Sequence, residues 1–117
     1  RYMKHLIDLK NACMHADQEL IDFIKKYEKI YIMGTGQYAE ELADQLNALN
    51  VTYDGFVVSN DQALKEGFFG KNVYHLKDIS DNADHLGILI AIKRNLKEII
   101  ERSIESNHIH NYYWPLL

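Results

Sequence analysis

The chain has 117 residues, a formal net charge of -4 and one cysteine, Cys13. This length predicts one domain, and a single cysteine cannot form an internal disulfide, so we expect a reducing, cytoplasmic setting. The acidic balance and the scattered basic residues argue against nucleic acid as a partner. No apolar run reaches the roughly 18 residues that a membrane span requires, so we expect none.

Residues 1–28 are predicted to form an N-terminal helical segment. Apolar residues recur at helical spacing from Met3 to Tyr27, which is typical of one long helix or two. The apolar stripe from Met3 to Met14 indicates either a linker towards a neighbouring domain of the same polypeptide or the seam of a homodimer. Because the sequence begins at Arg1 and not at a methionine, and stops just after Pro115, we expect the chain to be a fragment of a longer protein.

Residues 29–117 are predicted to form a Rossmann-like nucleotide-binding domain. Its first elements are a short apolar strand at Ile30–Met33, an amphipathic helix at Gln37–Leu49 and a second strand at Val51–Ser59. Asn50 suits the left-handed backbone position that ends a helix.

The middle of the chain is predicted to hold an irregular stretch and two further strands. Residues 60–70 read as a loop, Asn72–Leu76 as a weak short strand, and Lys77–His85 as one or two helical turns. Leu86–Ile92 is continuously apolar, as a strand buried on both faces requires. This run favours a parallel sheet that is covered by helices on both sides.

The last elements complete an alternation of strands and crossovers. Asn95 with Glu98 predicts a capping box for a helix that ends at Asn107, and the β-prone stretch His108–Trp114 predicts a final strand. Right-handed crossovers then give an α/β fold, a Rossmann-like doubly wound parallel sheet of about five strands in the order 3-2-1-4-5, with an additional N-terminal helix.

A glycine turn follows the first predicted strand and opens the next helix. It fits the dinucleotide pattern G-x-G-x-x-A with Gly34, Thr35, Gly36, Gln37, Tyr38 and Ala39. Gly34 allows the tight exit from the strand, and Gly36 leaves space where a Cβ would strike a pyrophosphate. The amides of Gly36, Gln37 and Tyr38 would face an anion at the positive end of the helix dipole.

The residue at the end of the second strand indicates whether the ligand is a dinucleotide. An acidic residue about 20 positions after the glycines would bind a ribose hydroxyl pair. That place falls on Ser59, Asn60 or Asp61, of which only Asp61 carries a charge. NAD is permitted but not indicated, and NADP is disfavoured because Lys65 is the one nearby cation.

The sequence resembles a Rossmann-like domain of bacterial envelope-polysaccharide enzymes. The likeness rests on "KIYIMGTGQYAEELADQLNALNVTYDGFVVSND", "VYHLKDI" and "ILIAIKRNLKEIIERSIES", and covers about residues 20 to 114. Similar domains precede sugar-nucleotide acetyltransferases of the pilin-glycosylation type and are appended to glycosyltransferases. The resemblance implies a transferase parent and a UDP-sugar ligand.

The resemblance also implies which positions hold the ligand. By position these are Gly34, Gly36, Gln37, Ser59, Asn60, Ala91 and Lys93. The acetyltransferase branch has aspartates where this chain has Ser59 and Asn60, and a glycine where it has Lys93. Lys93 and Arg94 are either solvated charges at the start of a helix or a source of cations for a phosphate.

Nothing in the sequence predicts catalysis by this chain. Short-chain oxidoreductases use a tyrosine with a lysine four residues later, and no tyrosine of this chain has one. His108 and His110 could share one face of a strand, but the sequence offers no third ligand, so we expect no metal site. Three hypotheses stay open: a non-catalytic nucleotide or nucleotide-sugar module, an NAD-binding domain of an oxidoreductase or epimerase, and an interaction module whose glycine turn is empty. In the last, Tyr112 to Trp114 would dock a neighbouring domain.

Overall fold

The computed structural model describes residues 18–115, and these form one five-stranded, wholly parallel sheet with the strand order β3-β2-β1-β4-β5. This confirms the predicted doubly wound α/β arrangement, including a helical segment ahead of the first strand, at residues 18–24. The predictions for Met3–Met14 and Cys13, including the homodimer seam, lie outside the described residues.

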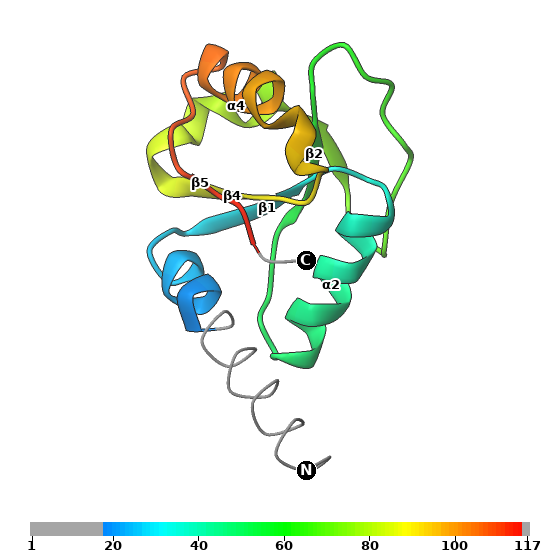
Figure 1. The fold of residues 1–117 in the computed structure, drawn as a ribbon, viewed down its shortest axis with the longest axis vertical. Coiled ribbons are helices and arrows are strands. Elements are labelled where there is room, and N and C mark those ends of the chain that lie inside the picture. The colour runs from blue at the N-terminus through cyan, green and yellow to red at the C-terminus, as the bar shows by residue number, and fades with distance from the viewer. Residues whose placement is uncertain (1–17, 116–117) are drawn as a thin grey trace.

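Each parallel strand is reached by a crossover connection, which is helical after β1, β3 and β4 and a loop between β2 and β3. Their bounds are β1 Lys29–Met33, α2 Gln37–Ala48, β2 Gly55–Val58, β3 Val73–His75, α3 Leu76–Ile79, η1 Ser80–His85, β4 Leu86–Ile90, η2 Arg94–Leu96, α4 Lys97–Ser106 and β5 Tyr112–Tyr113. Figure 1 shows residues 18–24 and α2 on one side of the sheet, with α4 on the other.

Two apolar cores lie on the two faces of the sheet because successive strand residues point to opposite sides. Ile30 and Ile32 of β1 pack with α2 and with Leu20 from the first helical segment. Met33, from the other face of the same strand, packs with Ile100 and Ile104 of α4. All five residues of β4 are buried, as the continuous apolar run predicts.

Three local predictions need correction. The second strand covers only Gly55–Val58, because Val51 still bonds to Leu46 at the end of α2 (N···O 2.9 Å). The last strand shrinks to Tyr112–Tyr113, since His108, with φ 63°, still belongs to the turn that ends α4.

The start of α4 is the third correction. Asn95 lies inside the 3₁₀ turn Arg94–Leu96, so α4 begins at Lys97 and has no side-chain cap. The capping box predicted for Asn95 and Glu98 is therefore wrong. Asn50, in contrast, takes the left-handed conformation predicted for it, with φ 57°.

Gly87 allows the first helical segment to approach the sheet. A Cβ at this position would lie 2.7 Å from Tyr27 Cδ2 and 2.8 Å from Phe23 Cε2, closer than side chains can pack. The Phe23 and Tyr27 rings, 5.0 Å apart, cover this part of β4, and Phe23 also stacks on Tyr113 at 5.4 Å. A glycine inside the buried strand thus makes room for an aromatic cluster.

We expect Gly87→Ala to lower the free energy of unfolding by about 1–3 kcal/mol, because the added methyl group overpacks the aromatic cluster. Gly67→Ala is the matched control, since a Cβ there meets only Lys71 O at an ordinary 3.7 Å. Urea denaturation of both variants measures the difference. Equal stability would show that residues 18–27 are not held against β4.

Tyr113 connects the edge strand to the first helical segment. Its hydroxyl donates to Glu19 Oε2 at 3.3 Å, and burial together with the Glu19 carboxylate raises the pKa of Tyr113 above its ordinary 10.0. The unfolded chain therefore loses this proton at a lower pH than the folded one, so the stabilisation is complete below pH 10 and is lost as pH rises further.

We expect the free energy of unfolding to fall above pH 10, and to fall less steeply in Tyr113→Phe, which has no proton to release. Urea denaturation between pH 8 and pH 11 tests this. Parallel pH profiles for the two proteins would contradict the role given to Tyr113.

Candidate functional site at the carboxyl end of the sheet

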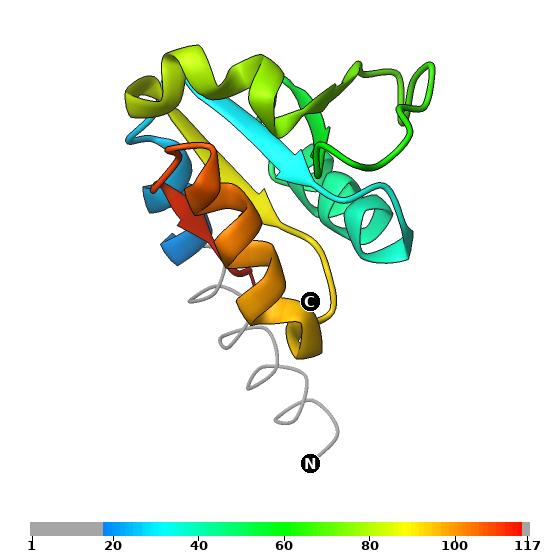
Figure 2. The same ribbon diagram turned by 90° about the horizontal axis from the view of Figure 1, so that it is seen from above.

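The glycine turn lies where β1 ends between β2 and β4. Gly34 N donates to Val57 O of β2 at 3.0 Å, and Ala91 N, just after β4, donates to Met33 O at 3.0 Å. Beyond this point the connection after β1 leads into α2 on one face of the sheet, and the connection after β4 leads into α4 on the other face (Figure 2). This divergence is the switch point at which ligands of open α/β sheets bind.

Gly34 is required by the fold itself. Its φ is +118°, a conformation that side chains rarely adopt, and a Cβ would lie 2.9 Å from Ala91 O and 3.3 Å from Ile92 Cγ1. The absence of a side chain at Gly34 therefore allows the ends of β1 and β4 to pack together.

Gly36 is not required in this way. It is the N-cap of α2, with an extended φ of -105°, and a Cβ built on it would have no other atom within 4 Å. Ser, Asp or Asn would cap the helix better at this position. The open space beside Gly36 is where the sequence predicts a pyrophosphate.

A cavity of about 390 Å³ occupies that open space. It is lined by Gly36, Gln37, Tyr38, Ala91, Ile92 and Lys93. All but Ile92 are among the predicted ligand-binding residues, so the fold brings the glycine turn and the end of β4 together. Tyr38 and Lys93 form walls of the cavity and do not fill it. Gly34 and Thr35 complete the turn beside it.

A second cavity of about 370 Å³ adjoins the first and shares Tyr38, Ile92 and Lys93 with it. Its other lining residues are Ile90, Arg94, Trp114 and Pro115. The sequence did not assign Trp114 to a ligand site. The predicted strand order could have identified Trp114, because residues that follow β4 and β5 meet at the carboxyl edge of the sheet, beside the glycine turn.

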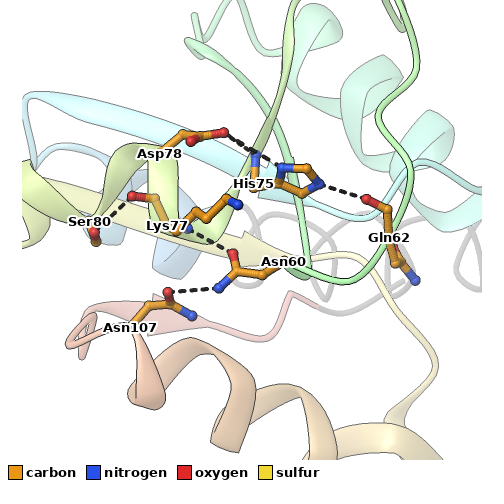
Figure 3. Close-up of polar contacts among 7 residues, drawn as sticks. All are labelled: Asn60, Gln62, His75, Lys77, Asp78, Ser80 and Asn107. Atoms are coloured by element: carbon orange, nitrogen blue, oxygen red, sulfur yellow. Dashed lines mark hydrogen bonds and ion pairs between the residues drawn. The ribbon is translucent and has the colours of Figure 1, made fainter.

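The predicted residues after β2 face different partners. Asn60 Oδ1 accepts from Lys77 N at 2.9 Å, and Asn60 Nδ2 donates to Asn107 Oδ1 at 3.1 Å (Figure 3). Ser59 Oγ accepts from Ser103 Oγ at 3.4 Å, and Asp61 is exposed in the following loop. Ser59 and Asn60 thus join β2 to α3 and α4, and neither they nor Asp61 line the two cavities.

A histidine holds the same loop to β3. His75 Nε2 lies 2.6 Å from Gln62 O, and the His75 backbone N donates to Asp78 Oδ2 at 3.2 Å (Figure 3). The loop also reaches the glycine turn, where Lys65 Nζ donates to Thr35 O at 3.1 Å. Lys65 at the turn and Lys93 in the lining of the first cavity therefore place cationic side chains beside the turn.

The aromatic residues at the end of the chain are bonded within the domain. Beside the Tyr113 contact already described, Tyr112 Oη donates to Glu105 Oε1 at 3.2 Å and Trp114 Nε1 donates to Glu101 Oε2 at 2.8 Å. These bonds and their partial burial anchor the side chains to α4 and the edge of the sheet.

Two searches of residues 18–115 gave no candidate. No group of three or more His, Cys, Asp or Glu side chains there could hold a metal ion, and no helix there is both long and apolar enough to cross a membrane. Comparison of the sequence with protein-family models and with curated proteins finds no match.

The two glycines of the turn should differ in their effect on stability. We expect Gly34→Ala to lower the free energy of unfolding by about 2–4 kcal/mol through backbone strain and the clash with Ala91 O. Gly36→Ala should cost less than about 1 kcal/mol, the loss from a poorer N-cap. Urea denaturation compares them, and equal losses would mean that the space beside Gly36 is not open.

Proposed function

We propose that the domain is a non-catalytic module that binds a nucleotide or nucleotide-sugar at the glycine turn. The observation that carries the proposal is Gly36, whose missing side chain is not needed by the fold and faces a cavity of about 390 Å³ at the switch point. Cavities of this size are ordinary for small ligands. A glycine without a packing role is accounted for by a ligand that approaches the backbone.

Charge and backbone geometry favour an anionic group in this cavity. The first turn of a helix has N–H groups without intrahelical acceptors, and those of Gln37 and Tyr38 begin α2 beside the cavity. Lys93 lines it, and Lys65 lies against Thr35 of the turn. A phosphate would satisfy the N–H groups and neutralise a cation.

The proposal of binding without catalysis is supported by the types of side chain around the two cavities. No described lining residue is an acid, a histidine, a serine or a cysteine, and the titratable ones are Tyr38, Lys93 and Arg94. Tyr38 and Lys93 have no carboxylate or histidine beside them in the described lining to act as a paired acid or base. The finer proposal, a UDP-sugar held for a cytoplasmic transferase that builds bacterial surface polysaccharide, rests on the resemblance of the sequence.

We expect Gly36→Val to raise the Kd for UDP-sugars by about a hundredfold, because the valine side chain would take the position of the phosphate. The free energy of unfolding should change by less than about 1 kcal/mol. Isothermal titration calorimetry with UDP-sugars, CDP-linked sugars and NAD(H) measures binding, and urea denaturation measures stability.

Gly67→Val, in the loop away from both cavities, is the control and should bind like the parent. If the parent protein gives no heat with any of these ligands, the glycine turn is empty and the domain is an interaction module. Unchanged binding in Gly36→Val would instead place the ligand elsewhere.

An NAD-binding domain remains the second candidate, carried by the G-x-G-x-x-A turn in its strand-to-helix setting. The residues after β2 give this candidate less support. Asn60 is bonded to Lys77 and Asn107, so only the exposed Asp61 could accept hydrogen bonds from the ribose hydroxyls. Micromolar binding of NAD(H) that is lost in Asp61→Asn would favour this candidate.

A further inference from the structure

The two cavities at the carboxyl edge adjoin each other. Tyr38, Ile92 and Lys93 line both, so a ligand anchored in the first lies next to the second. The first has the main-chain groups of the glycine turn, and the second has aromatic and apolar walls. Such a pair suits a two-part ligand with a phosphate and a ring. This inference rests on the function proposed above.

The second cavity has the chemistry of a site for a flat, acceptor-bearing ring. Ile90 and Ile92 supply apolar surface, and Tyr38 and Trp114 supply aromatic rings. Its charged lining residues are the donors Lys93 and Arg94, and no described lining residue carries a carboxylate. Carbonyl oxygens are matched by these donors. Uracil has two carbonyl oxygens and no amino group, whereas cytosine and guanine each pair one carbonyl with an amino group and adenine has no carbonyl.

Trp114 is held in place before any ligand arrives. Its indole Nε1 donates to Glu101 at 2.8 Å, while the Arg94 guanidinium lies 5.6 Å from the ring centroid and donates to Trp114 O at 3.3 Å. Three contacts thus fix the ring and the guanidinium relative to each other. A fixed aromatic wall loses little conformational entropy on binding.

The other side of the turn is occupied by the protein's own contacts. Asn60 is bonded to Lys77 and Asn107, and Lys65 lies against Thr35. Both cavities lie on the β4 side of the turn, away from the residues after β2. A ligand anchored at Gly36 therefore extends over β4 towards β5.

We propose that the cavity beside Trp114 is the base subsite of the bound nucleotide and that it selects a uracil-type base, with Tyr38 and Trp114 contacting the ring and Arg94 donating to a base carbonyl. The base thus lies over β4 and β5, and not at the end of β2 where a dinucleotide fingerprint would place a ribose.

Trp114 is the one tryptophan of the chain, so its fluorescence reports on this cavity alone. The full 117-residue chain is titrated with UDP, CDP, ADP and inorganic pyrophosphate, with fluorescence and calorimetry recorded together. We expect UDP to quench Trp114 and pyrophosphate to bind without quenching. CDP and ADP should bind about tenfold more weakly than UDP, within the range that one base contact contributes.

Two variants locate the base. Arg94→Ala and Tyr38→Leu should each weaken UDP binding about tenfold. Arg94 lines only the cavity beside Trp114, so Arg94→Ala should leave the affinity for pyrophosphate unchanged. Arg102→Ala, which removes an exposed charge from α4, is the matched control and should change neither. Tyr38 is about a third exposed, so Tyr38→Leu tests the subsite even if Arg94→Ala disturbs Trp114.

The outcomes separate the two proposals. The nucleotide site is supported if pyrophosphate binds and Gly36→Val removes that binding. The base subsite is overturned if UDP then binds without quenching Trp114 and without weakening in Arg94→Ala and Tyr38→Leu. Equal affinity for UDP, CDP and ADP overturns the selection of uracil. If neither UDP nor pyrophosphate binds, both proposals fail.

Discussion

The contact between the ends of β1 and β4 is the constraint on which the rest of this domain depends. Gly34 has no side chain and a positive φ, so Ala91 O can approach to within 2.9 Å of where its Cβ would be. The same place carries the backbone bonds from Gly34 to Val57 and from Ala91 to Met33. Three strands are thereby held side by side, and the segments that follow β1 and β4 must separate beyond them.

That separation produces the cavities. One connection leaves β1 for α2, and the other leaves β4 for α4 on the opposite face (Figure 2). Because neither helix covers the place where these two connections diverge, the first turn of α2 and the loop after β4 stay accessible to a ligand. Gly36 and Lys93 line the same cavity for topological reasons, whatever the ligand is.

The polar residues at the other end of the site serve the fold. Asn60 links three segments through Lys77 and Asn107, and His75 holds the loop through Gln62 (Figure 3). These hydrogen bonds lie at the surface, where each contributes modestly to stability. They fix the position of the loop whose Lys65 touches the glycine turn, and so support the site from outside it.

The strand order could be predicted from the alternation of strands and connections together with the right-handed crossover rule, and the two-sided burial of β4 and the place of the glycine turn from local signals, an apolar run and glycine spacing. The strands around β2 and β5 were predicted too long, since pairing partners and turns set where a ladder ends. The structural role of Gly34, the open space beside Gly36 and the bonds that hold Asn60 depend on contacts between distant segments, which no local pattern contains. Trp114 joins Arg94 and Tyr38 in one cavity because residues far apart in the chain meet where parallel strands end.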